Sequence, residues 1–354
     1  MALSGGGYKA AVFHLGVLTR INEMGRLGAI HRFSSVSGGS IAAGVLASQW
    51  TNLAFDGGGV ATNFKDLIFE PLIEFCRTAS IDAAAGIAGV LSPQKTAADQ
   101  VAKAYAEKLF GAKSLQDLPD GVNGPRFIFN ATNAQLNSLV RMSQAYLADY
   151  RIGLLAKPDI PLAQAVAASS AFPPFLSPLV LQLPVAIPSA LGADSNKAPF
   201  NKRLELTDGG VYDNLGIEAI WKRCRTLIVS NAGDPFVDKA NPSNDWISQL
   251  RRTVSMIHRQ AENNRLRTLM LLDQLKARDV AILNLRTKSV LGVPKLSDSE
   301  KAAVQAIEVR LSPLTAKEAK LLVQHGYSIA NSVLGLHWSG SPPPSANWPV
   351  TSIS

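Results

Sequence analysis

The spacing of apolar residues along the chain predicts alternating helices and strands. Apolar residues recur every three or four positions over residues 8–25, as in a helix, and residues 39–50 have the small, apolar composition of a helix packed closely on a sheet. Short apolar runs predict strands at 32–36 and 126–132, and residues 138–143 are expected to pair with the second of these.

The same patterns continue towards the C-terminus. A short alanine-rich helix is expected at 162–170, strands at 204–207, 226–230 and 280–285, and helices at 215–222, 247–275 and 316–334. This order predicts a single α/β domain with three layers, α/β/α, around a mostly parallel central sheet. In such sheets the chemistry lies at the carboxyl ends of the strands.

We expect the domain to cover residues 1–338, with a helical insertion at about 52–120 and an apolar, proline-rich loop at 172–193. Residues 339–354 are expected to form a loose C-terminal tail. The proline-rich loop either forms an apolar rim that meets lipid or packs over the sheet, and the sequence leaves both possibilities open.

The composition excludes several classes of protein. Of the 354 residues, 47% are hydrophobic and 18% are charged, which rules out intrinsic disorder and collagen-like repetition. The 35 Lys and Arg residues exceed the 27 Asp and Glu residues by 8, and this surplus favours anionic surfaces such as lipid headgroups or nucleic acid. The basic residues are spread out, however, so solvated basic faces are the simpler explanation and no nucleic-acid partner is expected.

Residues 171–193 carry no charge and reach the length of a membrane span, but a helix interior cannot accommodate their five prolines. No transmembrane helix is therefore expected, and the chain does not start with the segments of a signal peptide. Met1–Leu3 is short for a first strand, which favours a natural protein that begins further upstream. We expect a protein that is soluble or peripherally bound to a membrane, in a compartment that the sequence leaves open.

The two cysteines, Cys76 and Cys224, do not have the spacing of a thiolate metal site. Two buried free thiols are expected in preference to a disulfide.

A glycine-rich segment, residues 4–9 (Ser-Gly-Gly-Gly-Tyr-Lys), lies between the first predicted strand and the first helix. Three consecutive glycines leave their N–H groups open beside the positive end of the following helix. Such amides suit an anion or a developing oxyanion. The alternative explanation is a tight turn that requires glycine.

A second segment, residues 35–39 (Ser-Val-Ser-Gly-Gly), also joins a strand to a helix. It fits the nucleophile elbow G-x-S-x-G except that Ser35 replaces the first glycine. In such a turn the hydroxyl of Ser37 is exposed at the sheet edge, and the N–H of Gly38 points at the substrate. A serine- and glycine-rich connector is the alternative.

A third segment, residues 207–214 (Thr-Asp-Gly-Gly-Val-Tyr-Asp-Asn), leaves a strand and enters a helix. It places the carboxylate of Asp208 at a strand end, beside the open backbone of Gly209 and Gly210. Asp-Gly is also a common turn dipeptide, and residues 56–58 repeat it without a convincing strand before them, so this segment alone is a weak signal.

Together, the three segments resemble the patatin-like phospholipases, a family of lipid acyl hydrolases that use a Ser–Asp dyad. The resemblance is carried by residues 5–9, 35–39 and 208–210, and residues 168–173 (Ala-Ser-Ser-Ala-Phe-Pro) are similar to the family's small-residue stretch that ends in Phe-Pro. These marks extend from residue 3 to residue 216.

The resemblance implies a patatin-like catalytic domain that cleaves carboxylic esters of membrane or neutral lipids, as a phospholipase A-type enzyme or esterase. It makes Ser37 the nucleophile and Asp208 its direct general base. An ordinary Asp carboxylate, with a pKa near 3.9, is a feeble base, but burial beside Val36, Leu206 and Val211 would raise that pKa.

The resemblance also implies an oxyanion hole that receives the negative charge of the tetrahedral intermediate. Its donors would be the N–H groups of Gly5, Gly6, Gly7 and Gly38. Supporting positions in the two turns would be Gly39, Gly209 and Gly210. No metal or cofactor is needed, and the expected partner is a lipid substrate at a membrane surface.

Two positions depart from the family's pattern. Ala10 stands where a further glycine is common, which barely affects the oxyanion hole. Ser35 replaces the elbow glycine, which leaves the strain of the turn open but not the identity of the nucleophile.

The histidines test whether the site is a dyad or a triad. The chain order serine, acid, histidine leaves His258 open as a third member. It is expected inside a long helix, however, and not on a loop at a strand end. We therefore expect the histidines to be structural or solvated; they are His14, His31, His258, His325 and His337.

Two other functions remain open. Gly5-x-Gly7-x-x-Ala10 fits the loose dinucleotide-binding fingerprint and predicts an oxidoreductase, but no acidic residue ends a second strand about 20 residues later. The other alternative is a non-catalytic lipid-binding or scaffold protein. Nothing in the sequence favours it, because Ser37 and Asp208 are both present.

Overall fold

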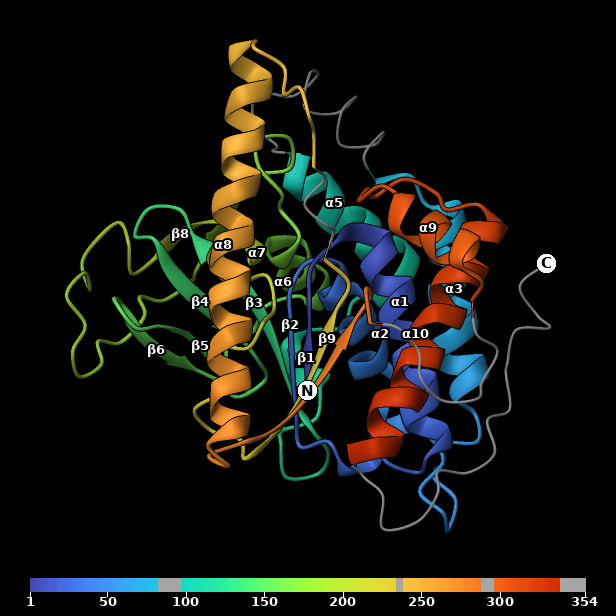
Figure 1. The fold of residues 1–354 in the computed structure, drawn as a ribbon. Helices are drawn as coiled ribbons and strands as arrows, with labels where there is room; N and C mark the ends of the chain where they lie inside the picture. The colour runs from blue at the N-terminus through green and yellow to red at the C-terminus, as the bar shows by residue number, and fades with distance from the viewer. Residues whose placement is uncertain (82–96, 234–237, 288–295, 338–354) are drawn as a thin grey trace.

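A computed structural model describes residues 1–81, 97–233, 238–287 and 296–337 (Figure 1). The described strands form one ten-stranded sheet in the order β10-β9-β1-β2-β3-β4-β5-β6, with β8 paired to β3 and β7 paired to β8. The predicted tail at 339–354 and the 82–96 part of the predicted insertion lie outside the described residues.

The strands from β10 to β3 are parallel, as predicted. They are β10 (Asp279–Asn284), β9 (Thr226–Asn231), β1 (Ala2–Leu3), β2 (Arg32–Ser35) and β3 (Arg126–Asn133). The pairs beyond are antiparallel and make the sheet mixed. They involve β4 (Ser138–Met142), β5 (Tyr146–Asp149), β6 (Gly153–Ala156), β7 (Leu179–Gln182) and β8 (Arg203–Asp208).

Helices lie on both faces of the parallel strands, which gives the predicted three layers (Figure 1). One face carries α1 (Gly7–Glu23), α2 (Gly38–Gln49) and α10 (Ala316–His337), and the other carries α8 (Trp246–Gln274). Shorter helices are α3 (Glu70–Thr78), α5 (Ala97–Tyr105), α6 (Leu162–Ser169), α7 (Gly210–Asp213) and α9 (Asp298–Ala306). Two π-helical segments occupy Lys65–Phe69 and Ala106–Phe110, and 3₁₀ turns occupy Leu27–Ala29, Trp50–Asn52 and Leu115–Asp117.

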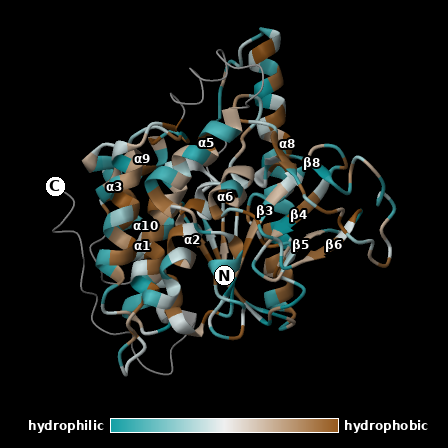
Figure 2. Ribbon diagram, turned by 180° about the vertical axis from the view of Figure 1, so that it is seen from behind, coloured by the Kyte–Doolittle hydropathy of each residue, from teal (hydrophilic) through white to brown (hydrophobic). Residues whose placement is uncertain are grey.

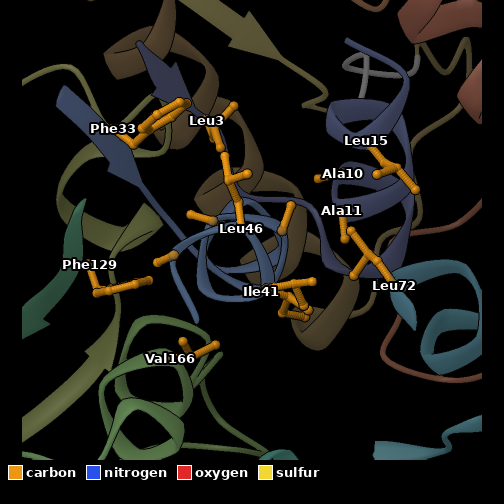
Figure 3. Packing of buried hydrophobic residues seen from close by; sticks show 14 of the residues in the cluster. Leu3, Ala10, Ala11, Leu15, Phe33, Ile41, Leu46, Leu72, Phe129 and Val166 are labelled. Atoms are coloured by element: carbon orange, nitrogen blue, oxygen red, sulfur yellow. The ribbon is translucent and has the colours of Figure 1, made fainter. Parts of the chain in front are cut away.

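The main core lies between the sheet and the helices α1 and α2. In Figure 3, Leu46 of α2 points towards Leu3 of β1, whereas Ile41 of α2 lies on the side of Ala11 of α1 and Leu72 of α3. Figure 2 shows hydrophobic residues on the parts of these helices that face the sheet. The parallel strands are buried along most of their length because both of their faces are covered.

The helices α1 and α10 pack through two glycines. A Cβ atom on Gly16 would lie 2.1 Å from the carbonyl oxygen of Val323, and one on Gly326 would lie 2.1 Å from that of Phe13. The two helix backbones are therefore in direct contact, which only glycine permits at these positions. This contact fixes α1, and with it the glycine-rich segment at its start.

One predicted helix is wrong. Residues 215–222 form turns after the short helix α7, because Gly216 takes a φ of 69° that ends any helix there. The apolar residues Leu215 and Ile220 are buried all the same, against the face of the sheet that α8 covers. Their spacing resembles that of a helix although the backbone forms turns.

The proline-rich loop at 172–193 contains β7 and has both buried and exposed apolar residues. Leu176, Leu181 and Ile187 are buried in the main core, whereas Phe172 and Phe175 are exposed. Both cysteines are free, with Cys76 buried and Cys224 half-buried. No helix among the described residues combines the length and the apolar composition that crossing a bilayer requires.

Candidate active site

Strands β2 and β8 meet head to head along the same edge of β3. The end of β2 pairs with Phe129 in parallel register, and Asp208 at the end of β8 pairs with Ala131 in antiparallel register. The carboxyl ends of the two strands therefore converge at Asn130. This convergence brings the turn with Ser37 next to the turn with Asp208, although the two strands run in opposite directions.

Ser37 has an unusual backbone conformation at the start of α2, with φ 51° and ψ −121°. A positive φ outside glycine costs about 1–3 kcal/mol and persists only where the surroundings enforce it. Here the N–H of Ser37 donates to the carbonyl oxygen and to the hydroxyl of Ser169, both at 3.1 Å. Ser37 thus lies on a sharp strand-to-helix turn, and its hydrogen bonds to Ser169 hold this turn in place.

The two residues after Ser37 must be glycines for this turn to pack. A Cβ atom on Gly38 would lie 2.0 Å from the carbonyl oxygen of Gly7, and one on Gly39 would lie 2.4 Å from that of Leu3. The start of α2 therefore lies directly on β1 and on the start of α1.

The carboxylate of Asp208 is buried and accepts a hydrogen bond from the N–H of Gly210 at 2.7 Å, and the side chain of Ser37 lies near enough to lower the pKa of Asp208. Burial raises the pKa of Asp208 to about 6, against the lowering influence of the Ser37 side chain and of the N–H of Gly210. The carboxylate is ionised at neutral pH and is a stronger base than an exposed aspartate.

The turn after Asp208 packs on β3 at Gly209. A Cβ atom there would lie 2.3 Å from the carbonyl oxygen of Asn130. The hydroxyl of Thr132 donates to the carbonyl oxygen of Asp208 at 2.9 Å and accepts the N–H of Tyr212 at 3.1 Å. The backbone of the turn is therefore fixed on both sides of the carboxylate.

The backbone N–H groups beside Ser37 belong to the N-termini of α1 and α2. Among the described residues, the N–H groups of Gly6, Gly7 and Gly38 have no hydrogen-bond acceptor. The N–H of Gly5, in contrast, donates to the carbonyl oxygen of Asn214 at 3.0 Å. The N–H of Gly5 is thus already paired within the protein, which favours Gly6, Gly7 and Gly38 over Gly5 among the predicted oxyanion donors.

Ser169, at the end of α6, connects the two turns and was missed in the sequence. Its hydroxyl donates to the carbonyl oxygen of Asn130 at 2.6 Å and lies 2.8 Å from that of Ser40. Its carbonyl oxygen accepts the N–H groups of Ser37 and, at 3.2 Å, of Gly209. The only signal in the sequence is its place in the segment 168–173.

His258 lies beside the site but does not contact its side chains. Its Nε2 atom is 3.0 Å from the carbonyl oxygen of Gly210, so α8 touches the turn through the backbone. Among the described contacts, no histidine hydrogen bonds to Ser37 or Asp208. The turn with Ser37 and the turn with Asp208 therefore lie side by side without a histidine side chain hydrogen-bonded to either residue among the described contacts.

His14 and His325 are buried structural residues. The ring of His14 lies 2.7 Å from the hydroxyl of Ser230 and 2.9 Å from the carbonyl oxygen of Ser4, and burial lowers its pKa to about 4. The Nε2 atom of His325 contacts the carbonyl oxygen of Leu285, and burial lowers its pKa as well. Both rings are neutral at pH 7.

The start of α1 does not resemble a dinucleotide site. The N–H of Tyr8 donates to the carbonyl oxygen of Arg310 at 2.9 Å, and a Cβ atom on Gly7 would lie 2.4 Å from that same oxygen. The backbone at Arg310 thus occupies one of the amides of the first turn, and lies against Gly7, on the side where a pyrophosphate would need to approach the helix.

Comparison with known proteins agrees with this arrangement. The family model of the patatin-like phospholipases matches residues 1–221, a range that holds both turns and the glycine-rich segment. The chain belongs to this family. No curated protein sequence matches the chain closely enough to count as a relative. Membership of the patatin-like phospholipases supports a lipid acyl hydrolase in general terms.

Solved structures show the same fold. Human GIVD cytosolic phospholipase A2 superposes with a TM-score of 0.54 at 13% identity, over 95% of this chain and 58% of that protein. The same human enzyme in complex with methyl gamma-linolenyl fluorophosphonate gives a TM-score of 0.51 at 13% identity, over 95% and 57%. The patatin-like chain described here therefore spans less than two thirds of the length of its structural neighbour.

Proposed function

We propose that this patatin-like protein hydrolyses carboxylic esters of membrane or neutral lipids with Ser37 as nucleophile and Asp208 as general base. The observation that carries the proposal is the convergence of the two strand ends, which places buried Ser37 beside the buried carboxylate of Asp208, near enough to lower its pKa. The positive φ of Ser37 between a strand and a helix supports the proposal, because a nucleophile elbow holds its serine on such a strained turn.

In the first half of the reaction, Asp208 takes the proton of the Ser37 hydroxyl while the oxygen attacks the ester carbonyl carbon. The tetrahedral intermediate then collapses, the bond to the alcohol oxygen breaks, and protonated Asp208 returns the proton to the leaving alkoxide. The products are an acyl-Ser37 ester and the free alcohol.

In the second half, Asp208 takes a proton from a water molecule, which attacks the acyl-Ser37 carbonyl. The bond to the Ser37 oxygen breaks, that oxygen regains the proton, and the fatty acid leaves. A pKa of about 6 suits both steps, because the carboxylate is free to accept a proton at neutral pH and its protonated form is still acidic enough to return it.

The negative oxygen of each tetrahedral intermediate would be received by the N–H groups of Gly6, Gly7 and Gly38. They stand at two helix N-termini, where the backbone dipoles add positive potential. Donors of this kind are each worth about 3–4 kcal/mol of transition-state stabilisation in other hydrolases.

The test is covalent labelling with an alkyl fluorophosphonate, followed by peptide mapping. We expect the label on Ser37, and no label on Ser37→Ala. Ser37→Ala and Asp208→Asn should each lower kcat for a short-chain nitrophenyl ester by at least about 1,000-fold. Ser170→Ala, one residue from the Ser37 contact on α6, is the matched control and should label normally.

His258→Ala separates the dyad from a triad. It removes a contact to a backbone carbonyl and should keep most of the activity. Loss of activity in a folded His258→Ala protein would replace the dyad by a triad. A wild-type protein that neither labels nor hydrolyses the ester would be a non-catalytic lipid-binding protein.

A further inference from the structure

Helix α8 extends beyond the edge of the sheet that carries the candidate site. It is anchored at that edge by His258, which contacts the carbonyl oxygen of Gly210, and by Glu262, which accepts a hydrogen bond from Asn231 at the end of β9 at 2.7 Å. The 12 residues of α8 that precede His258 rise a further 18 Å or so at the helical rise of about 1.5 Å per residue. Figure 1 shows this part of α8 standing above the other labelled helices and strands.

The projecting part of α8 carries an apolar face that points away from the protein. Trp246, Ile247, Leu250, Val254 and Ile257 fall within about 100° of one another on a helix of 3.6 residues per turn, and we call them the outward face. Each is between 45% and 75% exposed. An apolar face of this size marks a binding surface on an otherwise folded protein.

The orientation of the projecting part is the reverse of that in an ordinary surface helix, whose apolar stripe faces the core. Ser248 and Arg252, on the opposite side from the outward face, are the residues that become half-buried. The fully buried residues of α8, Glu262 and Leu269, belong to its second half. Packing against the protein therefore does not explain the apolar residues of the first half.

The charge beside the outward face is positive. On the helix, the exposed Arg251 follows next to the outward face, the segment Trp246–Ile257 contains no acidic residue, and the whole chain carries a net charge of +8. An amphipathic helix with an apolar face and an arginine beside it fits the boundary between anionic headgroups and acyl chains.

A second group of exposed apolar residues lies at the same edge of the sheet. The N–H of Asp208 donates to the carbonyl oxygen of Ala171, and the next residue, Phe172, is exposed, as are Phe175 and Val211. Apolar side chains therefore stand beside the Asp208 turn in addition to those on α8. A membrane that contacts both the outward face and the apolar residues beside the Asp208 turn would lie next to the site that a lipid ester has to enter.

We propose that the outward face of α8 docks on an anionic lipid bilayer and holds the Ser37–Asp208 site against it. This inference rests on the proposed lipid hydrolase activity, but the docking surface can be measured separately from the chemistry. The apolar side chains of the outward face enter the headgroup–acyl boundary, and Arg251 lies at the anionic headgroups.

The experiment measures sedimentation of the Ser37→Ala protein with vesicles, since this variant binds without altering the lipid. Vesicles of phosphatidylcholine mixed with phosphatidylglycerol are compared with vesicles of phosphatidylcholine alone. We expect tighter binding to the anionic vesicles, with a blue shift of tryptophan fluorescence that is lost in Trp246→Phe. Added salt should weaken the binding.

Leu250→Gln/Val254→Gln, made in the same Ser37→Ala background, should reduce vesicle binding by about tenfold or more, because two apolar side chains leave the interface. The matched control is Met270→Gln/Leu271→Gln, which changes two equally exposed apolar residues at the other end of the same helix. It should change binding by less than about twofold. Arg251→Gln should weaken binding to anionic vesicles by about fivefold, since one arginine near such a surface contributes about 1 kcal/mol.

In the active protein, the Leu250→Gln/Val254→Gln change should leave hydrolysis of a short-chain nitrophenyl ester in water unchanged and lower hydrolysis of lipid in anionic vesicles. Ester hydrolysis without any binding to anionic vesicles, or equal binding by the docking variant and wild type, would overturn the docking surface and leave the proposed activity standing. Vesicle binding that depends on Leu250 and Val254 in a protein that hydrolyses no ester would support docking and remove the hydrolase.

A second copy of the chain is the competing occupant of the outward face. Light scattering after size exclusion would then show a wild-type dimer that becomes monomeric in Leu250→Gln/Val254→Gln, with vesicle binding unchanged. That result would overturn the lipid-docking proposal.

Discussion

The main-chain N–H of Ser37 lies 3.1 Å from both the carbonyl oxygen and the hydroxyl oxygen of Ser169. The carbonyl oxygen of Ser169 also accepts the N–H of Gly209, the residue after Asp208. Ser169 of α6 therefore hydrogen bonds to the backbone at Ser37 and to the backbone next to Asp208, and so keeps the two turns in place relative to each other.

Ser169→Ala should lower kcat by about tenfold while KM stays near the wild-type value, because Ser169 positions Ser37 without touching the substrate. The change also leaves the carbonyl oxygen of Asn130 without its donor, at a cost of about 1–3 kcal/mol in the free energy of unfolding. The rate of fluorophosphonate labelling should fall with kcat. Ser170→Ala is the control, since its hydroxyl donates to the carbonyl oxygen of Val166 in α6 and lies 3.3 Å from the hydroxyl of Tyr105; equal effects of the two variants would contradict a positioning role for Ser169.

The pH dependence of kcat/KM should report the ionisation of Asp208. Since the general base acts as the carboxylate, activity on a soluble ester should rise with pH through a midpoint at about 6 and level off above it. An unshifted aspartate would give a midpoint near 3.9. A histidine base could give a midpoint similar to that of Asp208, so the same profile is measured for His258→Ala; a profile that disappears there would assign the titration to the histidine.

Asp208→Asn should stabilise the fold at neutral pH although it abolishes turnover. The folded-state pKa of about 6 lies above the ordinary value, so the folded protein binds the proton more tightly than the unfolded chain, and stability falls as pH rises from about 4 to about 6. Above that range the ionised carboxylate costs on the order of 3 kcal/mol. Thermal unfolding at pH 8 and pH 4 measures the effect: the gain in Tm of the variant over wild type should be larger at pH 8, and a gain that is larger at pH 4 would contradict it.

Gly38→Ala should abolish activity and destabilise the protein. The new methyl group would have to displace the carbonyl oxygen of Gly7, which lies 2.0 Å from its ideal position, and would separate the two helix N-termini. Gly57→Ala is the control, because a Cβ atom there meets nothing within 4 Å. Circular dichroism and ester hydrolysis would compare the two, and wild-type kcat in Gly38→Ala would show that the start of α2 tolerates displacement.

The sequence predicted most of the elements because apolar periodicity is strong where a segment is buried on one or both sides. It failed at 215–222, where Gly216 allows turns to bury apolar residues at helix-like spacing. The sequence also did not predict that β8 runs antiparallel to β3. The long connection between β7 and β8 would also suit a crossover between parallel strands, but the two strands pair antiparallel, and the apolar run that forms β7 gives no sign of its pairing.

At the site, the residue types of Ser37 and Asp208 are visible in the sequence because each is embedded in glycines at a strand end. The hydrogen bonds of the backbone are not visible. The N–H of Gly5 is paired with Asn214, and the N–H of Ser37 with Ser169, through contacts between residues far apart in the chain. Only the folded arrangement shows which amides remain open.

Because β2 and β8 both pair with β3, the distance between the nucleophile and its base depends on main-chain register along a single strand. Apolar side chains elsewhere can be exchanged and repacked without altering that distance. One extra residue between Phe129 and Ala131, in contrast, would shift the Asp208 turn by about 3.3 Å and turn its side chain to the opposite face of the sheet. The chemistry of this protein should therefore tolerate many substitutions in its core and no change of length in the middle of β3.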